Sequence, residues 1–215
     1  MIYTFFRLLG MLTGYPAQLL FFKRRTYYED KAATDLRHGG KLIICNHFSV
    51  VDYVMSAFLV FPRKLNVVCA EFPFKYPIAR FGMRFFGAIQ ANRQNRSMRF
   101  VDESAACLRK GQLVQIFPEG HNTPDGKMHE FKRSYIVIAH RAKVPIVPMV
   151  TDGNYGLFKR THVIIGREID VSQFITSTRR TPTREELERA NDYIYAKMLA
   201  LQEELERRKT KKARR

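Results

Sequence analysis

The stretch KLIICNHFSVVDYVMSAFLVF, residues 41–61, sets the pattern from which the fold can be read. Residues 41–45 form a mostly apolar run that is typical of a buried strand, and residues 50–61 favour a helix. His47 lies between the two and Asp52 lies in the first turn of the helix, so both are at the junction of strand and helix. Because ligands bind outside the carboxyl ends of strands in open α/β sheets, this junction is a candidate site.

His47 and Asp52 allow two interpretations. In the first, His47 is a general base, since histidine takes up a proton near neutral pH, and Asp52 fixes the tautomer of its ring and stabilises the imidazolium. In the second, Ser49 is the N-cap of the helix and Asp52 completes a capping box, so that His47 is an ordinary loop residue. Residues 46–52 alone do not decide between these interpretations.

The rest of the chain alternates expected strands with expected helices, which is the pattern of an α/β fold. Its 215 residues, 46% of them hydrophobic, are enough for one domain with a sizeable core. We therefore expect a single α/β domain over residues 26–206, with a mixed, largely parallel sheet flanked by helices. Residues 144–150 contain two prolines and predict an edge or irregular strand. The other expected elements are strands at 65–70, 87–91, 113–117 and 163–165, helices at 77–86, 97–111 and 131–141, and a polar connection at 26–40.

The C-terminal part of the chain predicts a docking helix followed by a basic tail. Thr183 and Glu186 form a capping box, and residues 183–206 carry one apolar stripe at spacings of three and four. Seven of the nine residues 207–215 are Lys or Arg, and such a run is typical of a disordered, solvated extension. The stripe consists of Leu187, Ala190, Ile194, Met198, Leu201 and Leu205.

Charged residues follow two further strands in the same way as His47 follows the first. Arg93 comes just after one strand and just before the helix that Ser97 is expected to cap, a position that suits phosphate binding, although a solvated loop explains it equally well. Glu119 and Gly120 follow another strand, and their Pro-Glu-Gly sequence also suits an ordinary type I turn. Three such groups at three strand ends are the arrangement that an α/β active site requires.

Neither a metal site nor a disulfide is expected. His121, Asp125 and His129 are spaced by four, like ligands on one helix face, but the Pro-Asp-Gly turn inside this segment excludes that helix. The cysteines are an odd number and lie in apolar segments, which indicates buried thiols in a reducing compartment. They are Cys45, Cys69 and Cys107.

Residues 1–25 are rich in Phe, Leu and Tyr and end in Lys-Arg-Arg. Arg7, Pro16 and Gln18 interrupt the apolar run, which is then too short for a spanning helix of about 20 apolar residues. We expect a helical segment that associates with a membrane without spanning it; a helix packed on the core is the alternative. The net charge of +17 requires an anionic partner, and no RNA-binding signature, zinc finger or helix-turn-helix pattern accompanies it.

Taken in order, these segments resemble the glycerolipid acyltransferase family over about residues 40–155. The matching motifs are NHxxxxD at residues 46–52, GxIxxxR at 87–93, FPEG at 117–120 and, at 144–148, VPIVP, which resembles the VPIVPV of the family. Residues 131–133 also fall where the family has FKRG, with Ser134 in place of the glycine.

The resemblance implies an enzyme that moves a fatty acyl chain from acyl-CoA or acyl carrier protein to the free sn-2 hydroxyl of 1-acylglycerol-3-phosphate and forms phosphatidate. It implies His47 and Asp52 as catalytic residues. It implies Arg93 as the phosphate contact, and Glu119 and Gly120 as substrate-binding residues with backbone N–H groups nearby for the oxyanion. It further implies a monotopic protein on the cytoplasmic face of a membrane, with membrane lipid and a lysophospholipid as partners, no bound cofactor and no nucleic acid.

Two departures from the family pattern concern the acceptor head group. Residues 68–72 lack the lysine that the family often has before a Glu-Leu pair, and His121-Asn122 follows FPEG where Thr-Arg is common. Another lysophospholipid acceptor therefore stays open, as does a non-catalytic basic protein that binds anionic lipid or nucleic acid.

Overall fold

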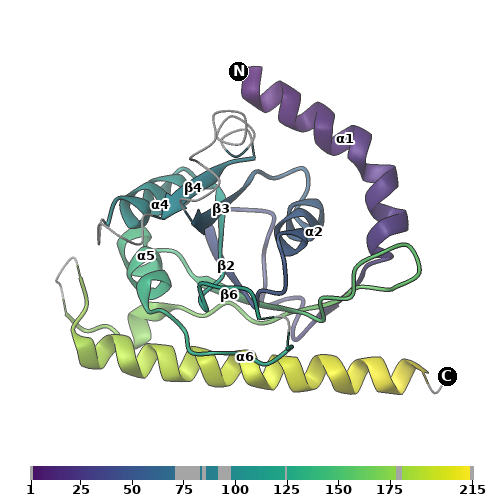
Figure 1. Cartoon of the computed structure of the whole chain (residues 1–215). Coiled ribbons are helices and arrows are strands. Elements are labelled where there is room, and N and C mark those ends of the chain that lie inside the picture. Colours follow the sequence, from purple (N-terminus) through teal and green to yellow (C-terminus); the bar gives the residue numbers. More distant parts are fainter. Residues whose placement is uncertain are drawn as a thin grey trace.

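The computed structural model describes residues 2–70, 83, 86–91, 98–123, 125–177 and 181–213. Within them, a seven-stranded sheet runs through the molecule in the order β1-β7-β6-β2-β5-β3-β4, with helices on both of its faces (Figure 1). The strands are β1 Arg25–Tyr28, β2 Lys41–Cys45, β3 Leu65–Ala70, β4 Ala88–Ala91, β5 Leu113–Ile116, β6 Ile146–Thr151 and β7 His162–Ile165. The helices are α1 Ile2–Phe22, α2 Val51–Leu59, α4 Arg99–Arg109, α5 Ser134–Ala142, α6 Arg184–Ala213 and the short 3-10 helix η2 Val171–Gln173.

The sheet is mixed and largely parallel, as the sequence predicts. Described neighbours pair in parallel everywhere except β6 with β7, which are antiparallel. Strand β2 lies between β5 and β6, so both of its edges are paired and both of its faces are covered. Strands in this situation are read as continuous apolar runs, which is why the bounds of β2 and β3 are predicted to the residue.

The side chains of β2 alternate between two apolar cores, because successive residues of a strand point to opposite faces. Leu42 and Ile44 lie in a core that α4, α5 and α6 cover. Ile43 and Cys45 lie in a second core, on the side of α1 and α2. Strand β2 therefore contributes side chains to both cores.

Strand β6 lies between β7 and β2, so of the two predicted alternatives, an edge or an irregular strand, the edge position is wrong. Pro148 directly precedes Met149, which pairs with Ile165 of β7. The Pro148 carbonyl accepts the Gly166 N–H at 2.8 Å. Proline has no N–H to donate in return. The Gly166 carbonyl accepts the hydroxyl of Thr34 at 2.9 Å instead. A buried threonine thus supplies a donor where the proline has none, and the strand can lie inside the sheet.

Two other expectations are corrected. Strand β1 begins the stretch that reads as a polar connection, and it pairs with β7 at the edge of the sheet. The N-cap position of α4 is Met98, one residue later than expected, and its side chain makes no capping hydrogen bond. Ser97 itself lies outside the described residues, as does most of the helix expected at residues 77–86.

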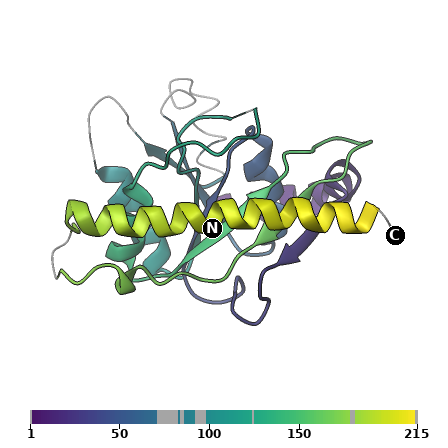
Figure 2. The same ribbon diagram turned by 90° about the horizontal axis from the view of Figure 1, so that it is seen from below.

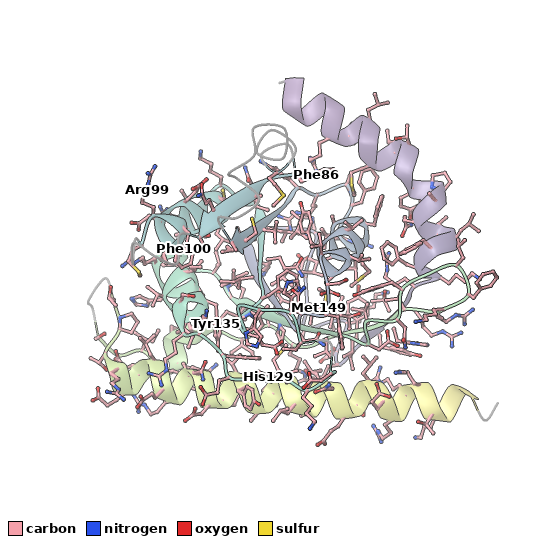
Figure 3. The ribbon with its side chains drawn as sticks, viewed as in Figure 1. Phe86, Arg99, Phe100, His129, Tyr135 and Met149 are labelled. Carbon is pink, nitrogen blue, oxygen red and sulfur yellow. The ribbon has the colours of Figure 1, made fainter. Side chains whose placement is uncertain are left out.

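Helix α6 opens with the predicted capping box. The Thr183 hydroxyl accepts the Glu186 N–H at 3.3 Å, and the Glu186 carboxylate accepts the Thr183 N–H at 2.8 Å. The same carboxylate accepts the N–H groups of Thr176 and Ser177, each at 2.8 Å. The box therefore fastens the preceding segment to the helix, and the apolar stripe then packs in the core with α5, where the buried Tyr135 lies 3.1 Å from Asn191 of α6 (Figure 3).

The helix continues to Ala213, so the prediction of a disordered tail from residue 207 is wrong for the described residues (Figure 2). Glu204 lies 2.6 Å from Arg208 along one helix face, an i to i+4 pair that supports a helix. Lys209 lies 3.3 Å from the buried carboxylate of Asp152, which ties the basic segment to the end of β6. The charge of the last residues alone does not reveal these acidic partners.

Helix α1 contains Pro16 and changes direction about halfway along its length (Figure 1). One side packs on α2, and Met11 is buried there. The opposite side exposes large apolar residues, of which Leu12 and Leu19 are 52% and 54% exposed. The packing alternative is therefore correct for one face only. Among the described residues, no helix combines the length and the apolar character needed to cross a membrane.

We expect Glu186→Gln to lower the Tm by several degrees at about pH 7, because a carboxamide accepts these N–H groups more weakly than a carboxylate. Hydrogen bonds from the Thr183 and Ser177 N–H groups hold the pKa of Glu186 below its ordinary value of 4.5. A carboxyl whose pKa is lower in the folded state stabilises above the unfolded pKa, and this stabilisation is lost as the pH falls.

The Tm difference between wild type and Glu186→Gln should therefore shrink as the pH is lowered below about 4.5. Thermal unfolding followed by circular dichroism measures it. Glu185→Gln is the matched control, since Glu185 is exposed in the same helical turn. A difference that stays constant down to about pH 3 would contradict the assigned role of the charge.

Candidate active site

The carboxyl ends of β2 and β6 are joined by a pair of hydrogen bonds between Asn46 and Thr151. The Asn46 amide donates to the Thr151 carbonyl at 2.9 Å and accepts the Thr151 N–H at 2.9 Å. Both residues are buried, so water does not compete for these bonds. The first residue of the NHxxxxD motif therefore fixes the point at which His47 leaves the sheet.

His47 and Asp52 form a hydrogen-bonded pair, with Nδ1 of the ring 2.8 Å from Oδ2 of the carboxylate. The Asp52 side chain is fully buried, and that of His47 is 17% exposed. Because a carboxylate only accepts, Nδ1 is the protonated nitrogen and Nε2 keeps its lone pair. The pair thus presents one proton acceptor at a partly open edge of the sheet.

Asp52 accepts three further hydrogen bonds. Its Oδ2 accepts the backbone N–H groups of Phe48 and Ser49 at 2.7 and 2.8 Å, and its Oδ1 accepts the hydroxyl of Tyr155. The two interpretations of Asp52 therefore describe one geometry, since the carboxylate that orients the histidine also closes the turn before α2. Ser49 is not the N-cap, because the helix begins at Val51 and its N-cap residue makes no side-chain bond.

Tyr155 is a site residue that the sequence analysis missed. It lies in the connection between β6 and β7, 103 residues beyond Asp52, and no motif or periodicity marks it. Burial raises the pKa of the Tyr155 hydroxyl, and the charge of Asp52 and the hydrogen bond to it raise the pKa further. The hydroxyl therefore stays protonated and serves as a fixed donor to the carboxylate.

The turn after β5 supports His47. The imidazole stacks on the Phe117 ring, with centroids 3.9 Å apart and planes inclined by 16°. Glu119 is 1% exposed; its Oε1 accepts the His47 N–H at 3.3 Å and its Oε2 accepts the His129 N–H at 3.0 Å. Both carboxylate oxygens are thus occupied by the protein backbone. This geometry fits a residue that orders the turn, and the predicted contact of Glu119 with a substrate stays a prediction.

Gly120 has a φ of +74°, which favours glycine, and its N–H donates to the Phe117 carbonyl at 3.0 Å. That N–H closes the turn, so it is not an open donor for an oxyanion. A Cβ at this position would lie 2.8 Å from Nζ of Lys132, so the glycine also leaves room for an exposed amine beside the turn. The match to FKRG was the signal that could have identified Lys132.

Three further expectations concern the phosphate contact, a metal site and the cysteines. Arg93, the expected phosphate contact, lies outside the described residues. His129 and Asp125 lie in an irregular segment, 3.5 Å apart, and the described part of the chain holds no group of three or more His, Cys, Asp or Glu arranged for a metal ion. Burial raises the pKa of the Cys45 thiol, and raises that of Cys69 to about 12, so neither is an activated nucleophile.

Residues 25–152 match the family model described as Acyltransferase. A 1-acyl-sn-glycerol-3-phosphate acyltransferase of Cocos nucifera is 28% identical over 158 residues, which are 71% of this chain and 50% of that protein. One from Bacillus subtilis is 23% identical over 173 residues, 78% of this chain and 84% of that protein. The chain thus spans about half the length of the coconut relative.

The fold has a solved counterpart. The crystal structure of the 1-acyl-sn-glycerophosphate (LPA) acyltransferase PlsC from Thermotoga maritima is similar with a TM-score of 0.64. The similarity covers 94% of this chain and 79% of that chain. The sequences are 21% identical, so this likeness shows the α/β fold with its flanking helices.

We expect Glu119→Ala to lower the free energy of unfolding by about 1–3 kcal/mol, because it removes the buried carboxylate that accepts the partly buried N–H groups of His47 and His129. Urea unfolding measures the loss. Glu130→Ala is the control, since Glu130 is exposed in the neighbouring segment and should change the free energy by no more than about 0.5 kcal/mol. Equal effects of the two substitutions would show that the Glu119 brace does not stabilise the fold.

Proposed function

Because the chain belongs to the acyltransferase family, we propose that it transfers a fatty acyl chain from an acyl thioester to the free sn-2 hydroxyl of 1-acylglycerol-3-phosphate and forms phosphatidate. The observation that carries this proposal is the His47–Asp52 pair, with Nε2 of the ring left as a proton acceptor. The names of the coconut and Bacillus relatives support the choice of acceptor. Acyl-CoA or acyl carrier protein is the donor.

His47 acts as the general base. An alcohol is a poor nucleophile, so Nε2 takes the proton of the acceptor hydroxyl as its oxygen attacks the thioester carbonyl. The tetrahedral intermediate then collapses, the C–S bond breaks, and the imidazolium returns the proton to the departing sulfur. A thiol has a pKa of about 8–9, so this leaving group needs little assistance.

Asp52 keeps the base in its reactive form. Its bond to Nδ1 holds the tautomer with Nε2 free, and it stabilises the imidazolium that forms during attack. Tyr155 and the N–H groups of Phe48 and Ser49 hold the carboxylate in place, so the ring cannot rotate away without breaking several bonds. Glu119 and the stacked Phe117 fix the backbone and the ring plane of His47.

The acceptor phosphate requires cationic partners. Arg93 is proposed from the GxIxxxR match, and Lys132 from its position beside Gly120. Residues 68–72 lack the lysine of the family, and Lys132 is proposed to supply a positive charge in its place. A cation paired with a phosphate in a partly enclosed site gives a charge-assisted hydrogen bond, which is stronger than a neutral one.

The acceptor is a lipid, so the enzyme must work at a membrane. The exposed apolar face of α1 is the proposed contact, and a monotopic association with the cytoplasmic face fits the basic residues that follow it. An apolar stripe directed away from the core is unusual for a helix that only packs on a soluble domain.

We expect His47→Ala to lower kcat by about 10²–10⁴-fold while the protein stays folded, because the substitution removes a proton acceptor. Asp52→Asn should cost a similar factor through loss of the tautomer. Release of the free thiol from acyl-CoA measures the rate. His38→Ala is the control, since the His38 side chain is 83% exposed. Near-normal turnover of His47→Ala would refute the mechanism.

Arg93→Ala and Lys132→Ala are each expected to lower kcat/KM for lysophosphatidate by roughly 10- to 150-fold, the value of a charged hydrogen bond of about 1.5–3 kcal/mol. The loss should be much smaller for an uncharged monoacylglycerol, which has no phosphate. Lys127→Ala, an exposed cation in the same region of the chain, is the control. Equal losses on both acceptors would show that the substituted residue does not recognise the phosphate.

A further inference from the structure

The connection between β6 and β7 contains a turn with two apolar residues at its tip. The Lys159 N–H donates to the Gly156 carbonyl at 3.0 Å, which places Leu157 and Phe158 at the two central positions. Phe158 is 99% exposed and Leu157 is 55% exposed. Central turn positions favour Gly, Asn, Asp, Ser and Pro, so an outward-pointing Leu-Phe pair is not explained by the turn itself.

The two ends of this connection, next to β6 and β7, are held together by hydrogen bonds, so the exposure of the tip does not result from a loose loop. The Asp152 N–H donates to the His162 carbonyl at 3.1 Å, and the Thr161 hydroxyl donates to the Asn154 carbonyl at 2.6 Å. A large apolar side chain held in water by a fastened backbone indicates an interaction site.

The turn is attached to the end of α1. The Gly156 N–H donates to the Phe21 carbonyl at 3.1 Å, and the Thr161 N–H donates to the Phe22 carbonyl at 2.9 Å. The ring of Phe22 also meets that of Tyr155 edge-on at 5.6 Å. Figures 1 and 2 both show the connection beside the C-terminal end of α1. The apolar tip and the helix therefore belong to one surface.

The exposed face of α1 continues this surface. Leu8, Leu12, Tyr15 and Leu19 follow one another at spacings of four, three and four, which places them on one stripe. Leu20 and Phe21 extend the exposed apolar area toward the turn. Three exposed cations border it: Lys23, Lys159 and Arg160.

We infer that the turn at residues 156–160 is a second membrane-contact element, which inserts Leu157 and Phe158 among the lipids of an anionic bilayer beside α1. Lys159 and Arg160 would then lie at the level of the lipid phosphates. Apolar side chains directly followed by Lys and Arg are typical of segments that lie in the membrane interface. The core of a protein–protein interface is instead depleted in lysine, which disfavours a protein partner.

The inference deepens the proposed function, on which its consequence for catalysis rests. Tyr155, which holds Asp52, precedes the tip by two residues, and a Cβ on Gly153 would lie 2.5 Å from the Phe48 ring. The same short connection therefore touches the membrane at its tip and the His47–Asp52 pair at its base. Insertion of the tip would place the proton acceptor next to the lipid surface that holds the acceptor.

Tryptophan fluorescence tests the insertion directly, because the chain contains no tryptophan. Phe158→Trp gives a single emitter at the tip, and Leu199→Trp gives one at an exposed position on α6. With vesicles of phosphatidylcholine and phosphatidylglycerol, we expect a blue shift and quenching by brominated acyl chains for Phe158→Trp alone. An unshifted, unquenched Phe158→Trp, whether or not the protein sediments with the vesicles, would overturn the inference.

Vesicle sedimentation of the full chain measures how much the tip contributes. Leu157→Ser with Phe158→Ser should weaken partitioning by roughly 10- to 100-fold, whereas Leu199→Ser should leave it unchanged. Lys159→Gln with Arg160→Gln should weaken binding to anionic vesicles and not to neutral ones. Unchanged partitioning of the Ser double variant would contradict insertion. Because no acyl donor is present, these outcomes are independent of whether the proposed reaction is correct.

Discussion

The buried carboxylate of Asp52 is the interaction on which the site depends. An unpaired charge without solvent contact costs several kcal/mol, so Asp52 is tolerable only where donors surround it. The donors come from separate parts of the chain: His47, Phe48 and Ser49 precede α2, and Tyr155 comes from the connection between β6 and β7. The Asn46–Thr151 bonds between β2 and β6 bring these parts together. Satisfying one charge therefore fixes the relative position of two strands, a helix and a loop.

The buried strands β2 and β3 could be predicted from sequence because their apolar runs are local, whereas residues 46–52 located the His–Asp pair and left its role open. A strand covered on both faces must be apolar throughout, and a motif at its end needs no distant residue to be noticed. The place of β6 could not be predicted in this way. Pro148 argues for an edge, and only the hydroxyl of Thr34, more than a hundred residues earlier in the chain, supplies the donor that lets it lie inside. The extent of α6 was missed for a similar reason, since Lys209 pairs with Asp152, which lies far from it in the sequence.

Glu119 shows how one position in a motif allows two roles. Its position in FPEG marks it as part of the site, and the structure places it within hydrogen-bonding distance of the His47 backbone. A carboxylate in a motif is equally expected of a ligand contact and of a backbone brace, and burial decides between them. Each oxygen of Glu119 accepts a backbone N–H group and the residue is 1% exposed, which favours the role of a backbone brace.

The arrangement of α1 and the connection that follows β6 fits an enzyme whose acceptor does not leave the bilayer. A soluble substrate diffuses to its site, whereas the acyl chains of a lipid stay in the hydrocarbon and only its head group reaches outward. In the proposed reaction, the protein must therefore bring Nε2 of His47 to the lipid surface. Tyr155 and the apolar tip lie on one short connection, and its backbone is bonded to the end of α1. In the proposed mechanism, a contact that orients the apolar surface against lipid also orients the base, because Tyr155 on this connection is hydrogen-bonded to Asp52, which holds His47.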